Sequence, residues 1–260
     1  MGSVMNTTPS LKELFDKDGY YLARGVFSPA EIKDLETDFD RIVQQLNRTG
    51  EDVNARWQGE QSKKLGAEKT TILHTHNVQI YSEVWHRAFL NPRFLDVVEQ
   101  ILGPDIVLHH SKLFQKPPEK GAPFPMHQDW SYFPTLKDTM IAAIIHVSPA
   151  TDEMGCLRVY PGSHTLGRVA GTSGQESSAF LDGYPLDGAV ALVAEPGDVA
   201  FFNYFTLHGS KPNYSAKTRK TVLAQLHAGN DAIEPGNTHP NARLVLRGWN
   251  HYAGRANANA

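Results

Sequence analysis

Between residues 195 and 203 the chain reads Glu195-Pro196-Gly197-Asp198-Val199-Ala200-Phe201-Phe202-Asn203. Proline, glycine and aspartate form a turn, and an apolar run of strand length follows them. Similar short runs, separated by turns that contain proline or glycine, recur through the second half of the chain. They cover residues 106–115, 125–130, 139–147, 155–160, 189–194, 199–203 and 220–227. Many short strands of this kind predict a mainly β core, either a sandwich or a barrel.

Helices are expected upstream of these strands. Ser28, Pro29 and Glu31 form a capping box with proline at the first helical position, which predicts a helix start. The apolar residues that follow keep helical spacing: Ile32, Leu35, Phe39, Ile42, Val43 and Leu46. A second helix is predicted from Asn91-Pro92 up to Gly103-Pro104. Residues 48–69 are charged and aperiodic, which favours a loop.

These patterns predict a single domain for the whole chain of 260 residues. A helical cover over about residues 10–103 would pack on one face of a β core over about 104–230. Residues 231–260 would form a C-terminal extension. The segment 162–188 is rich in Gly, Ser and Thr, and both a lid over a site and a simple insertion remain open for it.

Composition restricts the class of partner. The formal net charge is −3, which gives no basic surface for nucleic acid or an anionic membrane. No apolar run approaches the roughly 20 residues that span a bilayer, and the N-terminus lacks the pattern of a secretion signal. The single cysteine, Cys156, excludes an intrachain disulfide and fits a reducing compartment. We therefore expect a cytoplasmic protein that acts on a small molecule, with no prediction of its oligomeric state.

The candidate metal ligands begin in Pro125-Met126-His127-Gln128-Asp129-Trp130. In an extended strand, residues two positions apart point to the same face, so His127 and Asp129 would reach one ion while Gln128 points away. The best candidate for a third ligand is His208. Two histidines and one carboxylate that leave coordination positions open suit non-haem Fe(II) oxygenases. Further on, the Arg219 guanidinium could bind a carboxylate through two parallel hydrogen bonds.

An ordered set of short motifs extends this pattern. It consists of Gly103-Pro104, Lys116-Pro117-Pro118, Met126-His127-Gln128-Asp129, Tyr132-Phe133-Pro134, Gly155-Cys156-Leu157, Pro161-Gly162-Ser163-His164, Pro196-Gly197-Asp198, His208-Gly209-Ser210 and Arg219-Lys220. Over roughly residues 70–230 the sequence resembles the phytanoyl-CoA dioxygenase family of Fe(II)- and 2-oxoglutarate-dependent oxygenases. The resemblance implies a double-stranded β-helix, a cupin-like jelly roll, with helices packed outside it.

The resemblance also implies roles for single residues. His127, Asp129 and His208 would bind Fe(II), and Arg219 with Ser210 would bind the distal carboxylate of 2-oxoglutarate. Asn77 is a further candidate for a cosubstrate contact. The reaction implied is hydroxylation of an unactivated C–H bond, with dioxygen and 2-oxoglutarate consumed and succinate and CO2 formed. A ligating carboxylate at Asp129 favours hydroxylation over halogenation, because related halogenases have a small residue there.

The substrate is less well defined by the sequence. Trp130, Tyr132 and Phe133 follow the ligands, and they either line a substrate pocket or pack in the core. Human-type phytanoyl-CoA hydroxylases have a lysine where this chain has Asn77, and related enzymes have a tryptophan near Ile144. Both departures argue against phytanoyl-CoA itself as the substrate.

Two other functions remain possible from the residues alone. A zinc-dependent hydrolase would use the same three ligands and an activated water, but it has no need of Arg219. A non-catalytic cupin-like binding module would keep the fold alone. The other histidines, including His74, His109, His110, His146 and His239, are interpreted as structural. Lys112, Lys116 and Lys120 are interpreted as a solvated loop face.

Overall fold

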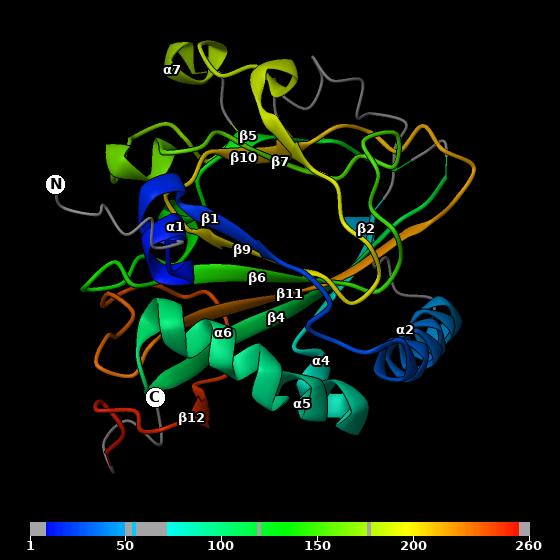
Figure 1. Cartoon of the computed structure of the whole chain (residues 1–260), viewed down its shortest axis with the longest axis horizontal. Helices are drawn as coiled ribbons and strands as arrows, with labels where there is room; N and C mark the ends of the chain where they lie inside the picture. Colours follow the sequence, from blue (N-terminus) through cyan, green and yellow to red (C-terminus); the bar gives the residue numbers. More distant parts are fainter. Residues whose placement is uncertain (1–8, 50–53, 56–71, 119–120, 176–177, 255–260) are drawn as a thin grey trace, which may run out of the picture.

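Two antiparallel β-sheets form the centre of the molecule (Figure 1). The computed structural model describes residues 9–49, 54–55, 72–118, 121–175 and 178–254. The large sheet has the strand order β1-β9-β6-β11-β4-β3-β2, and β12 also pairs with β4. The small sheet has the order β5-β10-β7-β8. The predicted mainly β fold is confirmed.

The strands have the following bounds: β1 Tyr20–Ala23, β2 Asn54–Ala55, β3 Ile72–His76, β4 Ile106–Lys116, β5 Phe124–His127, β6 Ile141–His146, β7 Leu157–Val159, β8 Val190–Leu192, β9 Val199–Asn203, β10 His208–Ser210, β11 Arg219–Ala228 and β12 Leu244–Arg247. The α-helices are α1 Leu11–Asp18, α2 Pro29–Thr49, α4 Val78–Tyr81, α5 Glu83–Phe89, α6 Pro92–Leu102 and α7 Ala179–Asp182. None of these helices combines the length and the apolar character that a membrane crossing needs.

Side chains along the central strands of the large sheet alternate between two apolar cores, one on each face of the sheet. Ile141, Ala143 and Ile145 of β6 belong to the apolar cluster that the helices complete. Ala142 of the same strand packs instead with Leu157 of the small sheet. This division follows from the strand period of two, which sends neighbouring side chains to opposite faces. The large sheet therefore has one face covered by helices and one face turned toward the small sheet.

The helices cover the outer face of the large sheet. In Figure 1, α5 and α6 lie below β4, on the side away from the small sheet. The predicted start of α2 is confirmed, since the Glu31 side chain accepts from the Ser28 N–H (2.7 Å) and Ser28 Oγ accepts from the Glu31 N–H (3.3 Å). The predicted helix after Asn91 is also confirmed as α6, with Asn91 as its N-cap.

Several elements were not predicted. The short helices α4 and α5 follow β3, and β12 pairs with β4 from the C-terminal part of the chain. The unpredicted strand β3 also pairs with β4. By contrast, Tyr20–Arg24 has the sequence pattern of a strand, and it does form β1, which pairs with β9. The division into a helical cover, a β core and an extension stays a prediction. Most of the predicted loop at 48–69 lies outside the described residues.

The turn just before β7 requires a glycine at position 155. Its φ is +65°, and an added Cβ would lie 2.2 Å from Lys211 O. Left-handed backbone at an alanine costs roughly 1–2 kcal/mol, and a clash in a packed interior roughly 1–3 kcal/mol. We expect Gly155→Ala to lower the free energy of unfolding by about 2–5 kcal/mol in urea titrations.

The matched control for this change is Gly236→Ala. Gly236 also has a positive φ (+85°), but no heavy atom lies within 4 Å of its added Cβ. This variant should lose only the backbone component, about 1–2 kcal/mol. Equal losses in the two variants would contradict a close-packing requirement at Gly155.

Candidate active site

The three predicted metal ligands lie together between the sheets. His127 ends β5 and His208 begins β10, and the two residues are paired in the small sheet with ring centroids 4.1 Å apart. Asp129 Oδ1 lies 3.4 Å from His127 Nε2 and 3.7 Å from His208 Nε2. All three side chains are buried. The structure therefore brings together donors that the sequence places far apart.

The backbone geometry that we expected at Asp129 was wrong. The strand ends at His127, and Asp129 has helical φ and ψ (−82° and −22°) because a 3₁₀ turn over Trp130–Tyr132 begins there. The Asp129 N–H donates to Tyr204 O (2.9 Å), which fixes this turn. Gln128 does point away from the ligands, and its Nε2 donates to Gly167 O and Phe205 O.

Backbone carbonyls orient both imidazoles. His127 Nδ1 lies 2.7 Å from Pro125 O, and His208 Nδ1 lies 2.9 Å from Thr206 O. Since a carbonyl only accepts, each Nδ1 carries the proton, and each Nε2 lone pair faces Asp129. This arrangement of a ring N–H bonded to a carbonyl is typical of histidines that bind metals.

The protonation states of His208 and Asp129 also bear on metal binding. Burial lowers the pKa of His208 to about 4, so its imidazole is neutral at physiological pH. Burial raises the pKa of Asp129, whereas a proton on His208 or His127 would act against burial and bring the pKa below its ordinary value. The site thus offers two imidazoles and one carboxylate within reach of a single ion. This donor set fits Fe(II) with positions left open for other ligands.

Gln225 is a partner of the ligand carboxylate that sequence reasoning missed. Its Nε2 donates to Asp129 Oδ2 (2.8 Å), and Asp129 Oδ1 remains directed at the imidazoles. Arg219, Thr221, Leu223 and Gln225 alternate along β11 and all line one cavity. The strand period, counted from Arg219, would therefore have found it.

We expect Gln225→Leu to weaken Fe(II) binding about 10–100-fold, the usual effect of removing a hydrogen-bond partner from a metal ligand. The reason is that Asp129 Oδ2 would lose its donor inside a buried site. Anaerobic Fe(II) titration gives the dissociation constant. Gln115→Leu on β4, outside the cavity lining, is the matched control. An unchanged constant in Gln225→Leu would contradict the positioning role.

Two basic side chains belong to the cavity region: Arg219 lines the cavity, and Lys116 bonds to the lining residue Ser210. Arg219 is buried and donates to Gly155 O. Lys116 is also buried, and its Nζ donates to Ser210 Oγ (2.8 Å) and Lys211 O (2.7 Å). Burial lowers the pKa of Arg219 to about 10, which still leaves it charged at neutral pH. Neither cation has a salt bridge within the part of the chain that the structure describes.

The prediction of a solvated face at Lys116 was therefore wrong. Lys116 is the last residue of β4, between the sheets, because the strand continues one residue past the predicted end. Lys112, on the same strand, lines the cavity itself; burial lowers its pKa, and the charge of Asp129 opposes this. Lys120 lies outside the described residues.

The cavity has a volume of about 280 Å³ and joins the metal ligands to Arg219. Tyr132 and Phe133 line it, whereas Trp130 and Asn77 do not, and a substrate contact by these aromatic residues stays a prediction. Trp130 Nε1 donates instead to Gln128 Oε1 (3.0 Å). Asn77 Oδ1 accepts from Gln79 Nε2 (3.2 Å) beside β4.

The segment 162–188 is attached next to the cavity. Thr172 O accepts from the Gln128 N–H (2.9 Å), and Ser173 O accepts from Tyr132 Oη (2.6 Å). Gln175 contributes to the cavity lining. A lid function for this segment stays a prediction.

Comparison with known proteins identifies the family. The family model described as phytanoyl-CoA dioxygenase matches residues 15–221. A probable alpha-ketoglutarate-dependent hypophosphite dioxygenase of Stutzerimonas stutzeri is 29% identical over 82% of this chain and 75% of its own length. The peroxisomal phytanoyl-CoA dioxygenase of Bos taurus is 27% identical over 81% of this chain, which spans 66% of that protein.

A solved structure agrees with the fold. The epimerase SnoN, in complex with Fe3+, alpha ketoglutarate and nogalamycin RO, has a TM-score of 0.71 and 21% identity, covering 91% of this chain and 97% of its own. The predicted double-stranded β-helix is thereby confirmed. The chain belongs to the phytanoyl-CoA dioxygenase family and is a 2-oxoglutarate-dependent dioxygenase, with iron and 2-oxoglutarate as its cofactor and cosubstrate.

Proposed function

We propose that this enzyme hydroxylates an unactivated C–H bond of a small organic substrate and couples the oxidation to decarboxylation of 2-oxoglutarate. Succinate and CO2 are the coproducts. His127, Asp129 and His208 bind Fe(II) in this proposal. The observation that supports it most is the single cavity, which has these three donors at one place and the Arg219 guanidinium at another.

Arg219 is the proposed partner of the distal carboxylate of 2-oxoglutarate. A buried guanidinium without a carboxylate partner is unfavourable. Arg219 is buried, and no carboxylate among the described residues forms a salt bridge with it. An incoming carboxylate would supply the missing charge and could accept two parallel hydrogen bonds. Ser210 Oγ, fixed by Lys116 Nζ, lies in the same cavity lining and offers a further polar contact.

The remaining residues position and protect the reactants. Bound iron supplies the activation of dioxygen, with 2-oxoglutarate as the source of electrons. Gln225 holds the Asp129 carboxylate, while the two backbone carbonyls hold the imidazoles. Apolar side chains complete the wall and exclude water: Phe114, Phe124, Phe133, Ile144, Leu157, Phe202 and Leu223.

The cavity limits the size of the substrate. Its volume of about 280 Å³ must be shared with 2-oxoglutarate, so it holds a small molecule or one end of a larger one. The two relatives carry names with very different substrates, hypophosphite and phytanoyl-CoA. The cavity size and the aliphatic Ile144 support a small substrate over a whole acyl-CoA. The single, buried Cys156 agrees with a cytoplasmic location, which we also propose.

Isotope tracing tests this function. The enzyme is mixed with Fe(II), 2-oxoglutarate and a panel of small organic molecules under heavy-isotope dioxygen, and succinate is measured. A true substrate should raise succinate formation, with one heavy oxygen atom in the product and one in succinate. A substrate that stimulates succinate formation but gives a product without heavy oxygen would contradict hydroxylation and favour another oxidation.

A further inference from the structure

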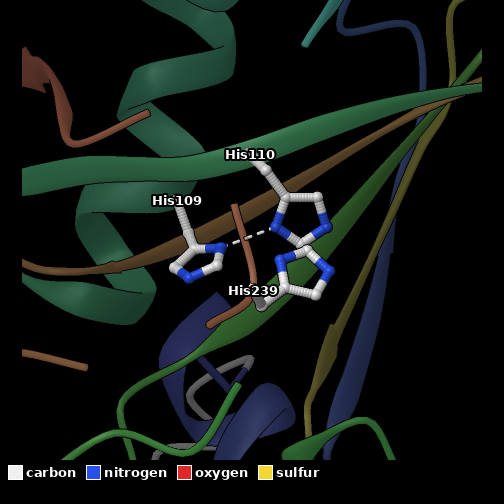
Figure 2. Close-up of side chains that lie close together, drawn as sticks. All are labelled: His109, His110 and His239. Atoms are coloured by element: carbon white, nitrogen blue, oxygen red, sulfur yellow. Dashed lines mark hydrogen bonds between the residues drawn. The ribbon is translucent and has the colours of Figure 1, made fainter. Parts of the chain in front are cut away.

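Two buried histidines and one half-buried histidine form a second cluster beside the active-site cavity. His109 and His110 lie on β4, and His239 lies in the loop before β12 (Figure 2). One ring nitrogen of each residue lies within 4.8 Å of the others. His109 and His110 are fully buried. None of these residues belongs to the iron site.

A β-bulge brings the two neighbouring histidines to one side. In the pairing of β11 with β4, Gln225 is opposite His110 and Leu226 is opposite Leu108, so His109 is an extra residue. Consecutive residues of a regular strand point to opposite faces, but a bulge re-aims one of them. The His109 and His110 rings consequently lie with centroids 4.9 Å apart. His239 completes the group, 4.4 Å from His110 and 5.4 Å from His109.

The imidazoles of this cluster are neutral, and their hydrogen bonds leave ring nitrogens unused: His239 Nδ1 lies 3.1 Å from Pro240 O, which leaves its Nε2 available. Burial lowers the pKa of His109 to about 3 and that of His110 well below its ordinary value, and the nearby Lys112 acts in the same direction. The two Nδ1 atoms are 2.6 Å apart, so one donates to the other. Within the described residues both Nε2 atoms are buried without a hydrogen-bond partner. Neutral imidazoles with available lone pairs are good ligands for transition metals.

We propose that His109, His110 and His239 bind a second transition-metal ion, for which Zn²⁺ is the representative probe. Three neutral imidazoles with a water in the fourth position form an established type of zinc coordination. Binding through the two Nδ1 atoms would replace the hydrogen bond between them. The proton of that bond would move to Nε2 of the same ring, so both imidazoles bind in the neutral form, and the rings would move apart until each ligand nitrogen is about 2.0–2.1 Å from the ion.

An ion bound by these three histidines would hold part of the active-site cavity lining in place. His239 and Phe133 both line the cavity. The Phe133 ring contacts the His109 and His110 rings, with centroids 5.5 Å and 5.3 Å away. Bound metal would therefore link the loop that contains His239 to β4, next to the Phe133 ring. This link would fix the shape of the cavity on that side.

Metal counting separates the two sites. The full-length protein is loaded with Zn²⁺, desalted and analysed by mass spectrometry for metal content. We expect two ions per chain in the wild type, since the iron ligands also accept Zn²⁺. The double variant His127→Ala/His208→Ala should retain only the ion of the histidine cluster. The single variant His109→Phe should retain only the ion at the iron ligands. The affinity of the second site should fall more than about 100-fold in His109→Phe, because removing even an outer-shell partner costs 10–100-fold.

Two further variants test whether a loss of bound metal is specific to the cluster or results from misfolding. His239→Gln changes the loop side of the cluster and should also bind one ion, while His74→Gln, a cavity histidine outside the cluster, should bind two. His109→Phe should retain the Fe(II)–2-oxoglutarate absorption band, which reports an intact iron site. One ion in the wild type that is lost with the iron ligands would overturn the proposal. So would a second ion that persists in both His109→Phe and His239→Gln.

Discussion

Asp129→Ala is expected to abolish succinate formation while the protein remains folded. The carboxylate is the only anionic donor among the three proposed ligands, and it lies within 3.4–3.7 Å of both imidazole Nε2 atoms. Removing an outer-shell partner of a metal ligand typically costs 10–100-fold in affinity or activity. Loss of the ligand itself should exceed that range. Succinate release and circular dichroism measure the two properties separately.

Asp152→Ala is the matched control for this change. Asp152 pairs with Arg158 (2.8 Å) and does not line the cavity. Its replacement should leave succinate formation near the wild-type rate. Full activity in Asp129→Ala would show that the carboxylate does not bind the iron.

Arg219→Met is expected to raise the KM for 2-oxoglutarate sharply. Methionine keeps an unbranched side chain but removes the charge and both hydrogen bonds to the cosubstrate carboxylate. Truncating one partner of a buried charge pair costs roughly 2–5 kcal/mol, which corresponds to at least about 30-fold in a dissociation constant. Steady-state kinetics with varied 2-oxoglutarate measure the change.

The neighbouring Lys220 supplies the control for Arg219. Its Nζ pairs with Glu36 (2.9 Å) and Asp40 (2.8 Å), away from the cavity. Lys220→Met should leave the KM for 2-oxoglutarate unchanged. A similar KM in Arg219→Met and wild type would show that Arg219 does not bind the cosubstrate carboxylate.

The sequence predicted the parts of this protein that depend on local pattern. The turn at Pro196-Gly197-Asp198 and the strand after it appear as β9, since an apolar run after a turn needs little tertiary context. The capping box at Ser28 likewise fixed the start of α2. The ligands His127, Asp129 and His208 could be proposed because their motifs occur in a fixed order.

Other features depended on contacts between distant segments. The turn at Asp129 is set by a hydrogen bond to Tyr204 O, which no local pattern around residue 129 reveals. Lys116 is buried because β4 extends between the two sheets, where Ser210 accepts its N–H. The pairing of His109 with His110 requires a bulge that appears only in the register with β11.

The most direct test of the iron and 2-oxoglutarate site is an anaerobic absorption measurement. Fe(II) and 2-oxoglutarate are added to the protein, and the visible metal-to-ligand charge-transfer band is recorded. The proposed site predicts a band in the wild type, no band in Asp129→Ala, and a band that needs more 2-oxoglutarate in Arg219→Met. Absence of the band in the wild type, together with absence of oxygen-dependent succinate, would contradict the assignment of this cavity as an iron and 2-oxoglutarate site.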